Sequence, residues 1–209
     1  LVLCYNHNLY TIKKLKGLIY MKKTTIAFFD IDGTIYREGL ITEVFKKMVK
    51  FEIIGGERWY NEVKPEFTKW DKRQGDYDLY LQKMIDVYME AIKGLKKDQI
   101  EYIAKRVIEQ KGDRVYTFTR DRIMWHKKQG HITIAVSGSP YELVKEMAKK
   151  YGLTDFRGAV YKIDENNLYT GEVIPMWDSK SKEKAILELI DIYNGDLEKC
   201  YAYGDTGGD

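Results

Sequence analysis

The stretch FFDIDGTI, residues 28–35, is the most informative part of this chain. An apolar run ends there in two aspartates, Asp30 and Asp32, and a Gly-Thr pair follows directly. Two like charges at the end of a buried strand repel each other unless one carboxyl is protonated or both meet a cation. The rest of the sequence must therefore supply a partner for these two carboxylates.

Strand-like runs recur along the chain and alternate with helix-like segments. The pattern predicts strands at residues 25–29, 131–136 and 200–203, and helices at residues 121–129, 140–151 and 181–193. Residues 158–173 have the pattern of a β-hairpin that turns at Asn166 and Asn167. Strands that alternate with helices favour parallel βαβ units, so the predicted fold class is α/β.

A long segment of different character separates the first two predicted strands. It is rich in Lys, Glu, Tyr and Met, and its apolar residues have helical spacing. A βαβ crossover needs only about 10–12 residues, so the segment is long enough for a helical subdomain. We expect residues 37–120 to form this cap, and residues 21–36 and 121–209 to form the α/β core.

Residues 1–20 are considered apart from these domains. They contain no basic region followed by a long apolar stretch, which argues against a signal peptide. Met21 opens the sequence MKKTTIAFFD as a natural start would. We therefore expect residues 1–20 to be translated upstream sequence, non-native or disordered. A real N-terminal helix around residues 12–20 is the alternative.

The composition excludes several classes of protein. The 209 residues are 44% hydrophobic and 32% charged, which is ordinary for a soluble globular protein. A net charge of only +3, spread along the chain, disfavours a dedicated nucleic-acid binder. No apolar run approaches the roughly 18 residues of a membrane span. Cys4 and Cys200 form no CxxC motif, which fits a reducing cytoplasm. The oligomeric state stays open.

Polar residues follow three of the predicted strands, at the carboxyl ends where parallel α/β sheets gather their ligands. These residues are Asp30, Asp32 and Thr34 after the first strand, Ser137 in SGSP after the second, and Asp205 and Asp209 in GDTGGD after the last. Four neighbouring aspartates need a cation, and oxygen-rich carboxylate sites suit Mg²⁺. A lysine-rich segment, DSKSKEK, precedes the last strand and offers a positive charge.

Glycines interrupt each of these polar clusters, at Gly33, Gly138 and Gly204. They allow the backbone to approach a ligand closely, so main-chain N–H groups there could hold a phosphate. An aspartate nucleophile, a metal, phosphate donors and a lysine are together the parts needed for phosphoryl transfer through an aspartyl-phosphate.

The order of these motifs resembles that of the haloacid dehalogenase superfamily. DIDGT at residues 30–34 fits its first signature, Asp-x-Asp-Gly-Thr, and a serine, a lysine and Gly-Asp-x-x-x-Asp at residues 204–209 follow in order. The resemblance covers residues 21–209 and implies a three-layer Rossmann-like parallel sheet with a helical cap inserted after the first strand. It is closest to the type-1 cap, phosphoserine-phosphatase-like subfamily. It implies a Mg²⁺-dependent phosphatase that hydrolyses a small-molecule phosphomonoester through an aspartyl-phosphate.

The resemblance also implies a role for each matched aspartate. Asp30 would attack phosphorus, and Asp32 would protonate the leaving oxygen and then activate water. Mg²⁺ would be bound by Asp30, the backbone carbonyl of Asp32 and Asp205, with Asp209 supporting the metal or its waters. Asp32 itself favours a phosphatase, because an acyl-phosphate needs a base beside it to be hydrolysed.

The same resemblance implies a set of phosphate-binding residues. Thr34, Ser137 and the glycine after it, Gly138, would hold phosphate oxygens, and a lysine would offset their charge. Lys182 is preferred to Lys180 for this role because small or apolar residues follow it three and four positions later.

The sequence is compatible with two other functions. A phosphotransferase or mutase would use the same intermediate, and a non-catalytic binding protein would use a basic cap surface.

Phosphoserine phosphatases carry a cap glutamate and a cap arginine. Glu38 lies near the first position, but no arginine occurs between residues 74 and 92. The substrate is therefore left open.

Aromatic and histidine residues outside the motifs are expected to be structural. The tryptophans Trp59 and Trp70, with the tyrosines of the inserted segment, are expected mainly in the core of the cap, with a few facing the cleft. His126 and His131 have no spacing that indicates a partner, and are expected at the surface or in packing.

Overall fold

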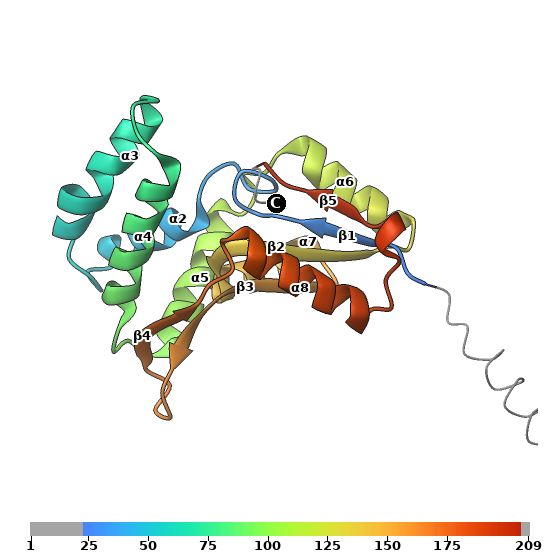
Figure 1. The fold of residues 1–209 in the computed structure, drawn as a ribbon. Coiled ribbons are helices and arrows are strands. Elements are labelled where there is room, and N and C mark those ends of the chain that lie inside the picture. The colour runs from blue at the N-terminus through green and yellow to red at the C-terminus, as the bar shows by residue number, and fades with distance from the viewer. Residues whose placement is uncertain (1–22, 206–209) are drawn as a thin grey trace, which may run out of the picture.

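The computed structural model describes residues 23–205, and these residues form an α/β fold (Figure 1). Its sheet has the strand order β4-β3-β2-β1-β5. The strands are β1 (Ile26–Phe29), β2 (Ile132–Pro140), β3 (Asp155–Ile163), β4 (Tyr169–Ile174) and β5 (Tyr201–Tyr203). Strand β1 pairs in parallel with β2 and β5, β2 pairs in parallel with β3, and β4 is antiparallel to β3. The three predicted strands and the hairpin are confirmed.

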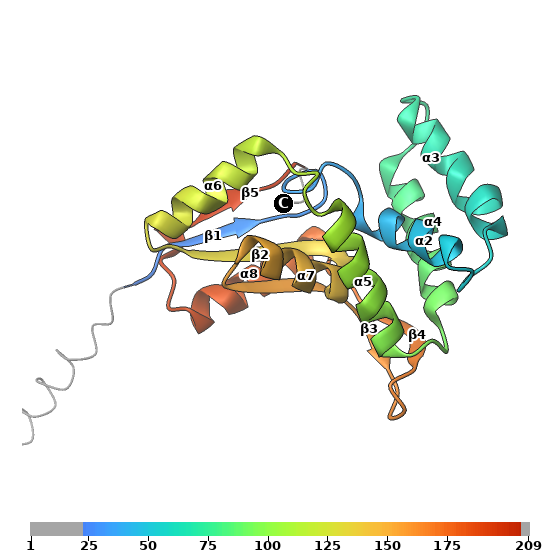
Figure 2. The ribbon, with the colours of Figure 1, turned by 180° about the vertical axis from the view of Figure 1, so that it is seen from behind.

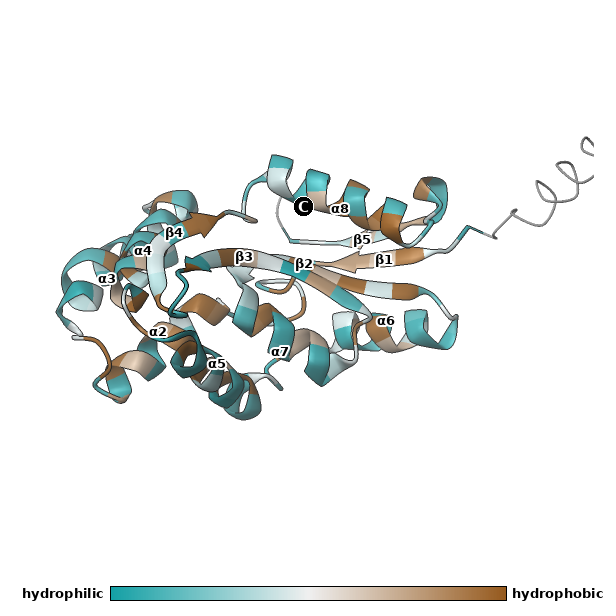
Figure 3. Cartoon of the chain, turned by 90° about the horizontal axis from the view of Figure 1, so that it is seen from below, coloured by the Kyte–Doolittle hydropathy of each residue, from teal (hydrophilic) through white to brown (hydrophobic). Residues whose placement is uncertain are grey.

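Helices lie on both faces of the sheet and beyond its end. They are α2 (Leu40–Lys50), α3 (Lys64–Asp71), α4 (Tyr77–Ile92), α5 (Lys97–Lys111), α6 (Thr117–Lys128), α7 (Tyr141–Tyr151) and α8 (Ser179–Ile192), with a π-helical segment at Trp59–Val63 and a 3₁₀ turn at Leu197–Lys199. Helix α8 covers one face, and α6 and α7 cover the other (Figures 1 and 3). The predicted three-layer α/β core and its three helices are therefore confirmed.

Local signals in the sequence set the ends of these elements. Asp178 precedes α8 and its carboxylate accepts a hydrogen bond from the Ser181 N–H, as an N-cap does. Gly152 ends α7 in the left-handed conformation, with φ of 61°, which glycine adopts without steric cost. In the hairpin, the Asp164 carboxylate accepts from the N–H groups of Asn166 and Leu168, and fixes the turn.

Strand β1 is apolar on both of its faces and is covered on both sides. Successive side chains of a strand point to opposite sides. Ile26 and Phe28 pack with Ala185 and Leu189 under α8. Ala27 and Phe29 belong to the larger cluster on the other face, which includes the inner side of α7. Figure 3 shows β1 in hydrophobic colours between the two helical layers. A continuous apolar run of this kind is typical of a strand covered on both sides.

The segment between β1 and β2 is helical, but it does not have a hydrophobic core of its own. Helices α2, α3 and α4 lie beyond the end of the sheet (Figures 1 and 2), while α5 packs against α7. One hydrophobic cluster runs from the sheet into these helices. Within it, the ring of Tyr88 on α4 meets the ring of Tyr161 on β3 edge-on, with centroids 5.2 Å apart. The domain bounds 37–120 stay a prediction.

Some expectations fall on parts of the chain outside the described residues. The proposal that residues 1–20 are an upstream extension is one of these, and the role of Asp209 is another. Between residues 23 and 205, no helix combines the length and the apolar character that crossing a bilayer requires.

A buried histidine supports the outer strand of the described sheet. His126 on α6 is fully buried. Its Nδ1 lies 2.8 Å from Nδ1 of His131, and its Nε2 lies 2.9 Å from the hydroxyl of Tyr203 on β5. The Tyr203 ring stacks on Phe29, with centroids 4.6 Å apart. The expected packing role is thus confirmed for His126, but the two histidines are also partners of each other. Burial, together with the charges of His131 and Arg122, lowers the pKa of His126 to about 4.

We predict that the free energy of unfolding decreases when the pH falls below the ordinary histidine pKa of 6.5. Between that value and about 4, the unfolded chain binds a proton at residue 126 that the folded chain excludes, so protons favour unfolding. The loss should be about 2 kcal/mol between about pH 7 and about pH 5, at 1.4 kcal/mol per pKa unit.

Urea titrations at the two pH values measure this loss. The variant His126→Gln cannot titrate at this position, so its stability should depend less on pH over the same interval. An equal pH dependence in the variant and the parent chain would contradict the assignment.

Candidate active site

The polar residues after β1 and β5 meet at one edge of the sheet. Because the two strands are parallel neighbours, their carboxyl ends lie side by side. The Asp30 N–H donates to the carbonyl of Tyr203 over 2.9 Å, which extends the strand pairing to the first aspartate. Strand β2, the other neighbour of β1, runs on to Pro140, with a register shift after Val136. Ser137 therefore lies within β2, not after it as the sequence predicted.

Asp30 is paired with Lys182. Its carboxylate is buried, at 8% exposure, and its Oδ1 lies 3.3 Å from Nζ of Lys182. Lys182 is in the first turn of α8, and its side chain is only 12% exposed. Lys180, the other candidate, is exposed. The N-cap at Asp178 fixes where α8 begins and so directs the fourth helical residue, Lys182, toward the sheet edge. The ion pair favours the ionised form of the Asp30 carboxyl.

Asp32 has a different environment from Asp30. Its Oδ1 accepts a hydrogen bond from the Leu40 N–H over 2.8 Å, at the start of α2. Its Oδ2 accepts from the Ser139 hydroxyl over 2.5 Å and lies 3.5 Å from the Ser137 hydroxyl. Burial raises the pKa of the Asp32 carboxyl. The hydrogen bonds from Ser139 and Leu40 and the charge of Lys182 oppose that rise, and the charge of Asp205 adds to it. The two aspartates therefore lie in different environments.

The turn after Asp32 fits closely against Asp205. Gly33 has φ of +80°, and a Cβ atom at this position would lie 2.1 Å from Oδ2 of Asp205. The hydroxyl of the next residue, Thr34, donates to Oδ1 of Asp205 over 3.2 Å. The carbonyl of Thr34 in turn accepts from the Thr119 hydroxyl over 2.7 Å. Glycine is thus required at residue 33 both for its backbone conformation and for the close approach of a carboxylate.

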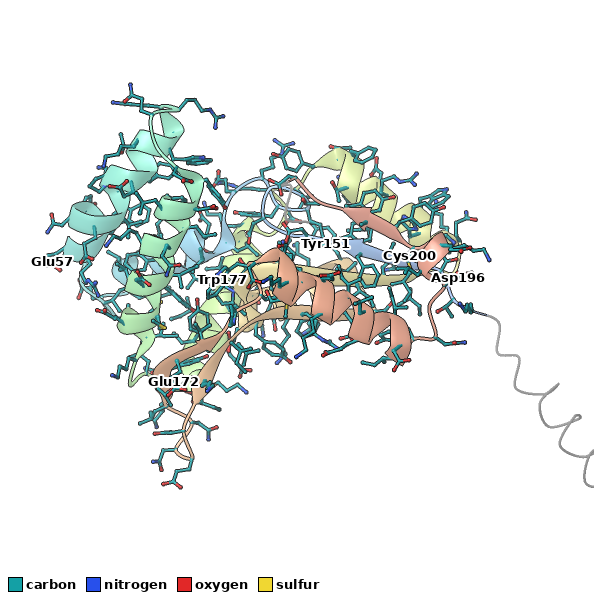
Figure 4. The ribbon with its side chains drawn as sticks, in the orientation of Figure 1. Glu57, Tyr151, Glu172, Trp177, Asp196 and Cys200 are labelled. Carbon is teal, nitrogen blue, oxygen red and sulfur yellow. The ribbon has the colours of Figure 1, made fainter. Side chains whose placement is uncertain are left out.

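The predicted phosphate-binding residues are only partly assembled into one group. Thr34 contacts Asp205, and the fully buried Ser137 hydroxyl accepts a hydrogen bond from the Ser139 N–H over 3.2 Å. Gly138 instead lies against Trp177, in the segment leading to α8 (Figure 4), where an added Cβ would be 2.9 Å from the Trp177 Cβ. The structure therefore brings Asp30, Asp32, Thr34, Ser137, Lys182 and Asp205 to one edge of the sheet, with Gly138 beside them.

Sequence reasoning missed Ser139 and the main-chain donor of Leu40. Ser139 is two residues beyond Ser137 in an extended strand, and residues two apart share a face. That spacing was visible in SGSP. The Leu40 donor carries no side-chain signal, because any residue except proline at the first position of α2 would present the same N–H group.

The oxygen donors at this edge are compatible with Mg²⁺. Between residues 23 and 205, no three side chains of His, Cys, Asp or Glu are grouped as a metal site. The expected set, however, uses only two side chains of this part of the chain, Asp30 and Asp205, with the main-chain carbonyl of Asp32. Mg²⁺ commonly takes one or two carboxylates and completes its shell with waters and substrate phosphate. The donor chemistry therefore fits that ion.

Comparison with known proteins gives a family for the chain. A family profile described as haloacid dehalogenase-like hydrolase matches residues 27–209. The "Inhibition of morphological differentiation protein" of Streptomyces azureus is 24% identical over 187 residues, which cover 88% of this chain and 66% of that protein. A Mycobacterium tuberculosis protein named "Probable phosphatase" is 37% identical over 92 residues, 44% of this chain and 32% of that protein. The matches thus span about two thirds of the first relative and about a third of the second.

A solved structure supports the fold. The phospho-aspartyl intermediate analogue of a phosphoserine phosphatase aligns with a TM-score of 0.57 and 21% identity, covering 90% of this chain and 81% of that one. At this identity the likeness shows a common fold.

We predict that Gly33→Ala destabilises the protein more than Gly94→Ala does. Both glycines have φ of +80°, but nothing lies within 4 Å of a Cβ at Gly94, whereas Asp205 blocks one at Gly33. The left-handed conformation costs each alanine variant about 1–2 kcal/mol. In Gly33→Ala the Asp205 carboxylate must also leave Thr34, which adds about 1.5 kcal/mol for a hydrogen bond to a charged group. Urea denaturation measures both variants, and equal losses would contradict the close fit.

Proposed function

Because the chain belongs to the haloacid dehalogenase-like hydrolase family, we propose that it is a Mg²⁺-dependent phosphatase acting on a small-molecule phosphomonoester through an aspartyl-phosphate intermediate. The observation that supports this most is the unequal setting of two neighbouring aspartates. Asp30 is paired with a lysine, while Asp32 is held by a hydroxyl and a main-chain N–H. Pairs of carboxyls in such different environments suit a division into nucleophile and acid–base.

Asp30 is the nucleophile in this proposal. Its carboxylate, kept ionised by Lys182, attacks phosphorus and forms an acyl-phosphate while the bond from phosphorus to the leaving oxygen breaks. Burial raises the pKa of the Asp32 carboxyl, so this group stays protonated to higher pH. It gives its proton to that leaving oxygen. The resulting Asp32 carboxylate then takes a proton from the water that attacks the acyl-phosphate, and phosphate is released.

The remaining residues hold the phosphate and the metal. When bound by Asp30, the Asp32 carbonyl and Asp205, Mg²⁺ supplies positive charge to the phosphate oxygens, and we propose that Asp209 supports it. Thr34, Ser137, the Gly138 N–H and Lys182 are proposed to hold phosphate oxygens. Lys182 has two functions in this arrangement, because its ammonium group also contacts the nucleophile.

Two other functions are the alternatives to this proposal. A phosphotransferase or mutase would pass the phosphoryl group to an acceptor other than water, and product analysis with candidate alcohols separates it from a phosphatase. A non-catalytic binding protein would release no phosphate from a generic aryl phosphate.

Phosphoserine is not favoured as the substrate, since Glu38 pairs with Arg114 at 3.5 Å and both side chains are half exposed. The two cysteines outside any CxxC motif lead us to propose a reducing cytoplasmic location.

We predict that the chain releases phosphate from p-nitrophenyl phosphate in the presence of Mg²⁺, and that Asp30→Asn reduces kcat to background, by about a thousandfold or more. The amide cannot form an acyl-phosphate, and each tenfold loss corresponds to about 1.4 kcal/mol in the barrier. Chelation with EDTA should abolish the activity, and added Mg²⁺ should restore it.

The matched control is Asp113→Asn. The Asp113 side chain is 82% exposed, and it pairs with Lys150 rather than with a residue of the candidate site. Circular dichroism shows whether both variants keep the fold. Turnover by a folded Asp30→Asn variant would end the proposed mechanism.

We further predict that Ser139→Ala lowers kcat by about tenfold. The variant removes the hydroxyl that orients the Asp32 carboxyl, and one hydrogen bond of this kind contributes about 1.5 kcal/mol. Steady-state kinetics on the same substrate measure the change. Ser179→Ala, at an exposed serine of α8, is the control. An unchanged kcat in Ser139→Ala would show that Asp32 needs no such support.

A further inference from the structure

Helix α2 begins without a side-chain cap of its own. Its N-cap residue is Gly39, which has no side chain to accept a hydrogen bond from the first turn. The first N–H groups of a helix have no partner within the helix, and a carboxylate beside them is stabilised by the helix dipole. Asp32 takes this place, because its Oδ1 accepts from the Leu40 N–H over 2.8 Å. The start of α2 and the proposed acid–base residue therefore hold each other in position.

A second contact joins the same turn of α2 to α4. The hydroxyls of Thr42 and Tyr80 share a hydrogen bond of 2.8 Å. Both residues are buried, with 7% exposure each, so water is not at hand to replace the bond if it breaks. Thr42 is only two residues after Leu40. A shift of this turn that breaks the bond to Tyr80 therefore also moves the N–H group that binds Asp32.

The ring of Tyr80 is itself held in place from α3. Trp70 stacks on it with centroids 5.7 Å apart, and Phe67 meets it edge-on at 5.4 Å. Contacts of these geometries are favourable for aromatic pairs and orient the ring between them. Helices α3 and α4 lie beyond the end of the sheet that carries the aspartates (Figure 1). The Tyr80 hydroxyl is thus a fixed point on the inserted helices, to which the first turn of α2 is attached.

The other oxygen of the Asp32 carboxyl is bound from the sheet. Its Oδ2 accepts from the Ser139 hydroxyl over 2.5 Å, whereas its Oδ1 is bound from α2. With one oxygen on β2 and the other on α2, the orientation of the carboxyl depends on how these two elements lie relative to each other. Proton transfer requires the acid to be within hydrogen-bond reach of the atom that receives the proton, so a small misplacement of α2 would slow that step.

We propose that Thr42 and Tyr80 are positioning residues for the proton transfer. Their hydrogen bond holds the first turn of α2 where the Leu40 N–H directs the Asp32 carboxyl toward the leaving oxygen. This inference rests on the proposed phosphatase function, and it makes one step of that reaction depend on how the inserted helices pack against the sheet. Neither Thr42 nor Tyr80 contacts the substrate in it. The loss of their bond affects the step in which Asp32 gives its proton.

The test compares two aryl esters that differ in their need for a proton. The oxygen of phenol leaves readily only when an acid protonates it, whereas 2,4-dinitrophenolate leaves without a proton. For Tyr80→Phe we expect kcat/KM for phenyl phosphate to fall about tenfold, and kcat/KM for 2,4-dinitrophenyl phosphate to change by less than about twofold. Thr42→Val should give the same pattern, and Thr42→Ser, which keeps the hydroxyl, should keep the parent values. The double variant Thr42→Val, Tyr80→Phe should lose no more than either single variant, because all three lack the same bond.

The matched control is Tyr169→Phe. The Tyr169 hydroxyl donates to the Glu142 carboxyl over 2.8 Å, and the two residues are buried, with 2% and 5% exposure. This variant thus loses a buried tyrosine hydrogen bond of the same length, and neither residue belongs to α2 or to the candidate site. It should change kcat/KM for neither ester by more than about twofold. Urea denaturation of each variant shows how much stability its change costs.

The outcomes separate this inference from the function beneath it. Equal losses on the two esters in Tyr80→Phe and Thr42→Val, or no loss on either, would overturn the inference and leave the phosphatase standing. The same conclusion would follow if Tyr169→Phe lost activity on phenyl phosphate alone, as Tyr80→Phe is expected to do. Failure of the parent enzyme to hydrolyse either ester with Mg²⁺ would overturn both.

Discussion

The parallel pairing of β1 with β5 is the contact on which the candidate site depends. It carries the hydrogen bond from the Asp30 N–H to the Tyr203 carbonyl, and two residues beyond Tyr203 it delivers Asp205 to the turn at Gly33. The result is a concentration of negative charge that would be unfavourable without cations. Lys182 supplies one positive charge from α8. Under the proposed function a bound Mg²⁺ would supply the rest, at the edge that this strand pairing builds.

This pairing is supported from the face of the sheet that α6 covers. The Tyr203 ring stacks on Phe29 of the neighbouring strand, and its hydroxyl is hydrogen-bonded to the buried His126. Arg122 also donates to that hydroxyl, over 3.0 Å. The ring and hydroxyl contacts of Tyr203 thus hold the end of β5, two residues before Asp205. This arrangement links the stability of the sheet edge to the protonation of a histidine.

The inserted helices are joined to the site more closely than a separate domain would be. Helix α2 begins at the N–H group that binds Asp32, and Thr42 in the same turn shares a hydrogen bond with Tyr80 on α4. The hydrophobic cluster continues from the sheet into these helices without a break. A substitution at Thr42 or Tyr80 would therefore act on the start of α2, where Asp32 is bound.

The fold class could be predicted from the amino-acid sequence alone, and short motifs were enough to nominate most of the candidate site residues. Apolar runs followed by Asp, Ser or Gly are local signals, and the strand-helix alternation is enough to place their carboxyl ends on one edge. Lys182 could be preferred to Lys180 in the same way, because the period of α8 determines which lysine turns inward.

The relations between distant segments could not be predicted from the motifs. The bond from the Leu40 N–H to Asp32, the fit of Gly33 to Asp205, the Ser139 bond to Asp32 and the bond between Thr42 and Tyr80 all join different elements of the chain. The mutual position of such groups depends on how helices and strands pack, and packing is a property of the whole core that no short window of sequence contains. The motifs therefore specify the chemistry, whereas the packing of the inserted helices against the sheet specifies what surrounds it.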